Sequence, residues 1–244
     1  MTALLLVFGV SGVVALAAVT VAAADRYVAR EAERRASEYL SAPLGRDARV
    51  RVHGSPFLTQ AIRGRYDRVE VTAAGMQLGV LVGTSMRAHL VNVHLPLRDL
   101  VGRRANELSV ERLHGDLVIP YRELVRVSRI PGLRFAYSDD DRLIATARVP
   151  VPGISQLARL SGEAVASIGD GGTVWVRVRN VSVAGITLPG LVLSQLVPTL
   201  AFPVPLPPLP YGLRIEGLTP TADGLQVSGS AAAVTFRRPV DPAG

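Results

Sequence analysis

Apolar and polar residues alternate along several segments of this chain, and that alternation constrains its fold more than any other feature. In RDARVRVHG, residues 46–54, alanine or valine at 48, 50 and 52 alternates with arginine or histidine. Successive side chains of a β-strand point to opposite faces of a sheet, so the pattern predicts a strand with one buried face. The same alternation predicts strands at residues 69–73, 113–119, 133–137 and 143–149.

Three predicted strands change the face that carries their apolar residues. The changes fall between residues 174–178 and 181–183, between 86–90 and 91–95, and between 225–227 and 234–236. A strand can keep one face buried through such a change only if a bulge or bend absorbs a residue. We therefore expect long, strongly curved antiparallel strands.

Helical periodicity interrupts the strands. In DRYVAREAERRASEYL, residues 25–40, apolar side chains recur every four positions with polar residues on the other side. This segment is a helix that packs on the core or, alternatively, lies on a membrane surface. Further helices are expected at 97–108, 121–129 and 154–168, and a hairpin turn at SDDD, residues 138–141. The expected fold class is α+β, with a long curved antiparallel sheet wrapped around helices.

The N-terminal segment favours export. Residues 2–24 carry no charge, and about 20 apolar residues span a bilayer core. The run ends in three alanines, which also fits a signal-peptidase site, so an uncleaved transmembrane anchor and a cleaved signal both remain open. Arginines follow the run rather than precede it, against the positive-inside preference. We expect a signal or anchor at 1–24 and a single domain at 25–240, outside the cytoplasm.

Composition narrows the partners and argues against catalysis. All 27 basic residues are arginine and the net charge is +7, which favours an anionic partner. The arginines are scattered without a nucleic-acid-binding motif, so we expect no nucleic acid. The chain has no cysteine, its four histidines lack metal-ligand spacing, and no nucleophile elbow, P-loop or dinucleotide motif occurs. We expect no metal, no cofactor and no enzyme activity, and read Asp139–Asp141 as a solvated turn rather than a cation site.

Two stretches, residues 52–75 and 202–229, resemble the paired signatures of the LmeA-like phospholipid-binding family of actinobacterial cell-envelope proteins. The G-x-P-F-L-x-Q element is matched by Gly54, Pro56, Phe57, Leu58 and Gln60. The L-P-x-L-P-Y/F-G-L element is matched by Leu206, Pro207, Leu209, Pro210, Tyr211, Gly212 and Leu213. The apolar N-terminal segment and first helix belong to the same pattern, so the resemblance covers nearly the whole chain.

The resemblance implies an exported, membrane-associated protein that binds phospholipid. In mycobacteria the family supports envelope lipoglycan assembly, and support of envelope lipid or lipoglycan assembly is a role that the resemblance suggests without implying it for this chain. It also suggests a fold similar to the tubular lipid-binding (TULIP) proteins. The main alternative is a structural or scaffold protein of the envelope, whose core is filled by its own side chains. The candidate lipid-binding residues are Phe57, Leu58, Leu133, Phe135, Val204, Leu206, Leu209, Tyr211 and Leu213.

The segment PVPLPPLPYGL, residues 203–213, combines five prolines with apolar side chains and no charge. Proline has no backbone N–H, so such a strip leaves few donors to satisfy when it is buried. It can therefore line a lipid groove at little desolvation cost, or it can close the core as a buried edge segment. Phe57 and Leu58 are in the same way either core residues or residues of the groove mouth.

Overall fold

The computed structural model describes residues 22–38, 40–41, 47–95, 107–138, 140–149, 158–169, 173–183, 186–187, 201–207 and 212–237. The predicted anchor or signal at 1–24 and the predicted helix at 97–108 lie almost entirely outside these ranges. In the part that is described, no helix is both long enough and apolar enough to cross a membrane.

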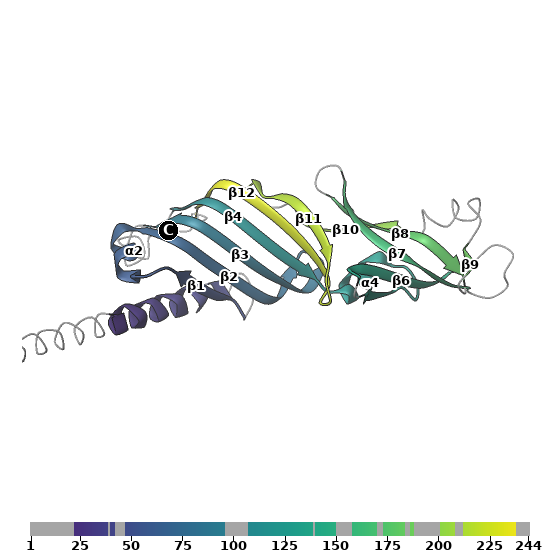
Figure 1. The fold of residues 1–244 in the computed structure, drawn as a ribbon, viewed down its shortest axis with the longest axis horizontal. Coiled ribbons are helices and arrows are strands. Elements are labelled where there is room, and N and C mark those ends of the chain that lie inside the picture. The colour runs from purple at the N-terminus through teal and green to yellow at the C-terminus, as the bar shows by residue number, and fades with distance from the viewer. Residues whose placement is uncertain are drawn as a thin grey trace, which may run out of the picture.

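Two antiparallel sheets, lying end to end, make up most of the described chain (Figure 1). The first sheet has the order β1 (Arg49–His53), β2 (Arg65–Leu78), β3 (Leu81–His94), β4 (Glu107–Ile119), β12 (Leu225–Arg237), β11 (Arg214–Pro220). The second has the order β10 (Ala201–Val204), β8 (Val174–Val183), β7 (Ala158–Ile168), β6 (Arg142–Val149), β5 (Arg134–Ser138), with β9 (Ile186–Thr187) paired to β8. The helices are an N-terminal one over residues 22–38 and 40–41, α2 (Phe57–Arg63) and α4 (Tyr121–Ser128). The α+β class and the antiparallel strands are confirmed, although the strands form two sheets rather than one.

The three predicted changes of face are confirmed, and each has a residue with positive φ. Asn92, Asn180 and Ala233 have φ of 52°, 51° and 52°. In the first sheet the bends of neighbouring strands lie side by side. The pairing of β2 with β3, of β3 with β4 and of β4 with β12 is in each case interrupted by one residue pair, and these pairs are formed by Asp67, Asn92, Glu111 and Ala233. Buried residues stand three positions apart across this line, so the strands bend there together and keep one apolar face.

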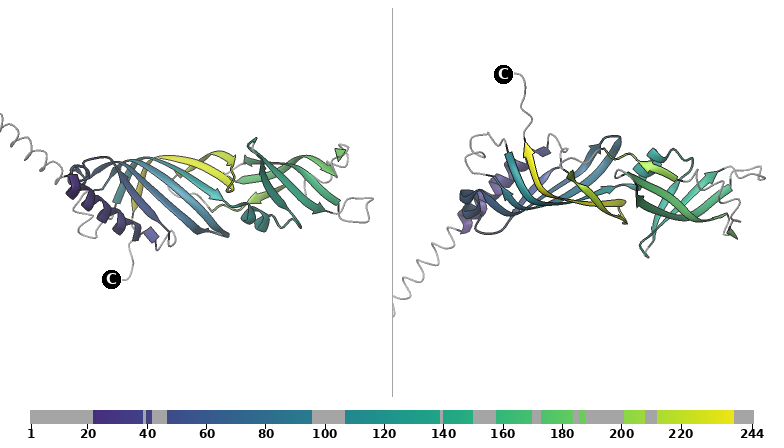
Figure 2. Two further views of the ribbon diagram at one scale, coloured as in Figure 1. Left: turned by 60° about the horizontal axis from the view of Figure 1, so that its bottom comes forward. Right: turned by 90° about the horizontal axis from the view of Figure 1, so that it is seen from above.

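The N-terminal helix packs on the apolar face of the first sheet, as Figure 2 shows. Its small Ala29 and Ala32 contact the core of that sheet, which confirms a core-packing helix. Two of its polar side chains satisfy the free edge of β1: the Val52 N–H donates to Glu33 Oε1 at 2.6 Å, and the Val50 N–H donates to Ser37 Oγ at 2.8 Å. An edge strand is thereby capped by side chains instead of by another strand.

The helix expected at 154–168 is wrong, because residues 158–168 form strand β7 between β6 and β8. Leu160, Gly162 and Ala164 are buried at alternate positions, which is the period of a strand. Alanine and glycine at these positions weaken the alternation in the sequence, and pairing along both edges outweighs the helix propensity of alanine and glutamate. The helix expected at 121–129 and the hairpin at 138–141 are confirmed as α4 and the β5–β6 turn.

Helix α4 joins the two sheets. Glu123, 7% exposed, accepts a hydrogen bond from the Val82 N–H at 2.9 Å and forms an ion pair with Arg126 at 2.6 Å. Arg126 also donates to the Val80 carbonyl, so the β2–β3 hairpin is held against the helix. On the opposite side, the Tyr121 hydroxyl donates to the Thr221 carbonyl at 2.6 Å and fixes the β11–β12 turn.

Replacing Glu123 by glutamine should destabilise this junction in a pH-dependent way. The hydrogen bond from Arg126 holds the pKa of Glu123 below its ordinary value, so the ionised carboxylate stabilises the fold above pH 4.5 and this contribution is lost as the pH falls below it. We expect E123Q to lower the Tm by roughly 2–6 °C at pH 7 and by less near pH 3. Thermal unfolding of both proteins against pH measures this, and a difference in Tm that is constant with pH would contradict it.

Candidate lipid-binding site

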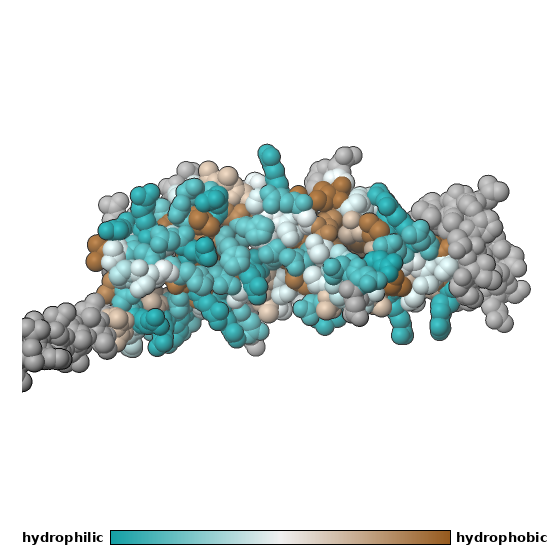
Figure 3. All heavy atoms as spheres, in the orientation of Figure 1, coloured by the Kyte–Doolittle hydropathy of each residue, from teal (hydrophilic) through white to brown (hydrophobic). Residues whose placement is uncertain are grey.

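A continuous apolar core runs from the second sheet into the end of the first. The inner face of the second sheet contributes aliphatic side chains and Phe202, while β3, β4, β12 and α4 contribute the remainder. Its fully buried members include Leu81, Ile119, Leu124, Leu160, Val174, Val176, Val181, Val204 and Leu225. The core is not fully covered where the sheets meet, and Figure 3 shows hydrophobic residues gathered at this junction. Leu206, Ile215 and Leu218 are only half-buried against it, and we call these three the seam residues.

Small side chains leave a gap in the inner face of the second sheet. It measures about 10 Å³, roughly the room of one water molecule, and lies between β6, β7 and β8. It is lined by Leu133, Ala145, Ala147, Leu160, Ser161, Gly162, Val178 and Val181. This gap is too small for an acyl chain, which would have to part the layers beside the alanines and the glycine.

The edge of the second sheet belongs to an uncharged part of the sequence, since no charged residue occurs between Arg179 and Arg214. In this part of the sequence the structure describes β10 and the residues that directly follow it, 205–207. Val204 is 1% exposed and Leu206 is half-buried, whereas Pro203 and Pro205 face solvent. From Phe202 to Leu206 the chain thus presents every second side chain to the core and reaches the seam at Leu206.

The predicted lipid-binding residues fall into two groups that the structure does not bring together. Leu133, Phe135, Val204 and Leu206 share the core of the second sheet. Phe57 is buried in the core of the first sheet, Leu213 packs against that core, and Leu58 is half-buried at the start of α2. Leu209 and Tyr211 lie outside the described residues. The sequence analysis missed Ala145, Ala147, Gly162, Ile215 and Leu218.

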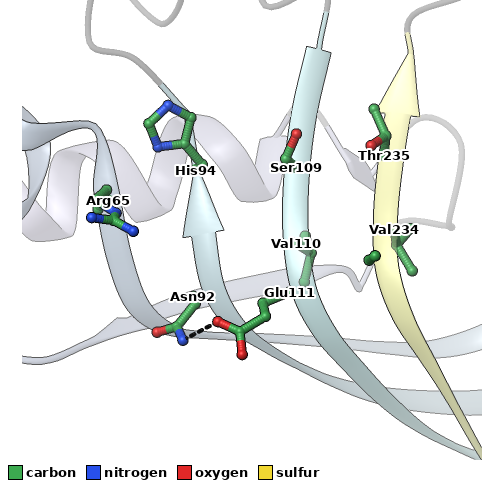
Figure 4. A pocket seen from close by; sticks show the side chains of 9 residues that line it. Arg65, Asn92, His94, Ser109, Val110, Glu111, Val234 and Thr235 are labelled. Atoms are coloured by element: carbon green, nitrogen blue, oxygen red, sulfur yellow. Dashed lines mark hydrogen bonds between the residues drawn. The ribbon is translucent and has the colours of Figure 1, made fainter.

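A separate hollow of about 450 Å³ lies on the outer face of the first sheet. Arg65, His94, Ser109 and Thr235 form a cross-strand row on four neighbouring strands, as Figure 4 shows. Beside the row, Asn92 donates to Glu111 at 2.5 Å. The hollow is open, and six of its nine lining residues carry polar or charged side chains, so it suits a headgroup or ions better than acyl chains.

Asp140 and Asp141 of the acidic turn form contacts with side chains of their own hairpin. Asp140 pairs with Arg142 at 2.6 Å, and Asp141 accepts a hydrogen bond from the Tyr137 hydroxyl. Within the described ranges, no group of three or more histidine and acidic side chains is arranged to hold a metal ion.

The comparison with protein families decides the identity. The family model described as LmeA-like phospholipid-binding matches residues 19–230, which is most of the chain. The chain belongs to the LmeA-like phospholipid-binding family. No curated protein and no solved structure matches it significantly.

In this LmeA-like chain the G-x-P-F-L-x-Q element builds a socket for the N-terminal helix. The Phe57 and Leu58 N–H groups donate to the buried carboxylate of Asp25, at 2.9 and 2.7 Å. Gln60 accepts a hydrogen bond from the Asp67 N–H at 3.0 Å, and it lies so close to Gly54 that a Cβ there would be 2.5 Å from its Nε2. These contacts explain the element structurally, because they fix α2 and the helix that docks on it.

Proposed function

We propose that this protein binds a phospholipid through the apolar core of its second sheet and shields the acyl chains there from water. The carrying observation is that this core continues past Phe202 and Val204, which belong to the uncharged part of the sequence before Arg214, to the half-buried seam residues. Acyl chains would enter at the seam and follow the inner face of the sheet past its small side chains. Membership of a phospholipid-binding family supports the ligand class.

The energetics favour carriage or presentation of a lipid over tight capture. Burial of an acyl chain in protein contributes about 0.8 kcal/mol per CH₂ relative to water, and a bilayer contributes nearly as much. Transfer between membrane and protein is therefore close to neutral, and the core only has to exclude water. A net charge of +7 favours an anionic headgroup.

The proposal includes an extracytoplasmic location, with the uncharged residues 2–24 as an anchor or export signal. It also includes a TULIP-like mode of lipid binding. Two features support this mode: the curved sheets lie end to end, and the N-terminal helix packs against one of them. The proposal further includes support of envelope lipid assembly without enzymatic turnover, for which membership of a phospholipid-binding family is the support. The competing proposal is a structural protein of the envelope that binds no lipid. Detection of lipid bound to the purified chain would distinguish the two proposals.

Filling the gap tests the lipid site directly. Ala147, 4% exposed, lines the gap, and leucine there should occupy space that an acyl chain needs, at a stability cost of about 1–3 kcal/mol. We expect Ala147→Leu to lose most of the phospholipid that co-purifies with the full chain, as measured by mass spectrometry of organic extracts. Ala136→Leu, on the exposed side of β5, adds the same volume and should keep the wild-type amount. Wild-type amounts of lipid in both variants would place the lipid away from this gap, and a wild-type chain that carries no lipid would favour the structural protein.

A further inference from the structure

The end of the first sheet that carries α2 exposes large apolar side chains. Ile62 is 74% exposed, Tyr27 is 73% exposed and Val28 is 39% exposed. Asp25 binds the start of α2, so the first turn of the N-terminal helix and α2 lie against each other. We call this surface of Tyr27, Val28 and Ile62 the helical tip; it lies at the left of Figure 1.

Basic side chains surround the helical tip. Arg26 and Arg30 are exposed on the N-terminal helix, Arg63 is exposed in the last turn of α2, and Arg65 is exposed at the start of β2. In the described part of the chain, no carboxylate lies within ion-pair distance of Arg63 or Arg65. An aromatic and an aliphatic side chain ringed by arginine is the composition of a surface that sits in the headgroup region of an anionic membrane.

The sequence supplies the second argument. The uncharged residues 2–24 directly precede Asp25, so the chain enters the domain at the helical tip. We infer that the helical tip docks on the surface of an anionic phospholipid bilayer, with Tyr27 and Ile62 in the interface and Arg63 and Arg65 on lipid phosphates. The polar hollow beside Arg65 then faces the headgroup layer, and the seam is held away from the membrane.

This orientation can be measured on the full chain because it contains no cysteine. Single cysteines at Ile62→Cys and Tyr27→Cys carry an environment-sensitive fluorophore, and the proteins are reconstituted into phosphatidylglycerol–phosphatidylcholine vesicles with nitroxide-labelled lipid. The control is Val80→Cys, which is 56% exposed at the other end of β2. Fourteen strand residues separate the two ends by roughly 45 Å.

We expect the labels at positions 62 and 27 to be quenched by nitroxide lipid and the label at position 80 to remain unquenched. On anionic vesicles, Arg63→Glu and Arg65→Glu should each weaken docking roughly fivefold, whereas Arg134→Glu in β5 should not. Equal quenching at 62 and 80 would overturn the inference, because the molecule would then lie along the membrane. Absence of quenching at 62 on vesicles that carry the protein would also overturn it, and would point to a protein partner. Neither outcome depends on lipid bound in the second sheet, so the two proposals fail independently.

Discussion

Leu206→Arg should abolish most phospholipid binding while the protein stays folded. Leu206 is half-buried at the seam, so without lipid the long arginine side chain can lie along the apolar surface and keep its guanidinium in water. With lipid bound, the acyl chain occupies that route and the charge is desolvated without a partner. We expect affinity for phospholipid vesicles or fluorescent phospholipid to fall roughly tenfold or more, with a change of a few degrees in Tm.

Two further variants make this result specific. Thr219→Arg places the same charge on the exposed side of β11, next to the seam, and should leave lipid binding unchanged. Val204→Arg, at a position only 1% exposed, should prevent folding because its charge cannot reach water. If Leu206→Arg unfolds like Val204→Arg, the strip simply closes the core. If it folds and takes up lipid normally, the seam is not the route to the core.

Gly224→Ala should cause the largest loss of stability of any single methyl addition considered in this chain. Gly224 has φ of +155°, and an added Cβ would lie 2.2 Å from the Ile119 carbonyl oxygen and 3.0 Å from Pro120 Cα. The turn is fixed on both sides, since the Thr221 N–H donates to the Gly224 carbonyl at 2.9 Å and Tyr121 holds the Thr221 carbonyl. Backbone must therefore shift at the junction of the sheets, at a cost of roughly 3–5 kcal/mol.

The matched control is Gly217→Ala in the neighbouring β11, where the nearest atom to an added Cβ is Ser228 Cβ at 3.9 Å. Chemical denaturation of both variants should show a large shift of midpoint for Gly224→Ala and almost none for Gly217→Ala. Similar midpoints would mean that the β11–β12 turn relaxes freely and does not hold the sheets together. Lipid binding by Gly224→Ala, measured where it remains folded, would show how far the seam depends on this turn.

The sequence by itself determined many of the strands, the bends of three of them and the family. Alternation of apolar residues follows directly from the geometry of a strand, so β1 and β6 could be predicted from the order of apolar and polar residues alone. The changes of face predicted three bends, because a buried face can be kept only if the backbone turns, and the structure places these bends at Asn92, Asn180 and Ala233. The two motif stretches identified the family, since their proline and glycine spacing leaves few other interpretations.

Several features became visible only in the tertiary structure, because they depend on contacts between distant residues. The helix predicted at 154–168 became β7 when pairing on both edges outweighed local propensity. Glu33 and Ser37 stand at the spacing expected of polar residues on the solvent side of a helix. In the structure they accept hydrogen bonds from N–H groups of β1, and the periodicity of the sequence does not reveal these bonds.

The division of the chain into two sheets also separates Phe57 from Leu206, although their motifs occur together in the sequence. A motif records which residues are needed, but not which surface each one faces. The physical reason is that the arrangement of whole sheets determines which side chains pack together. Pairing between strands that are distant in the sequence sets that arrangement, together with the contacts of α4 at the junction.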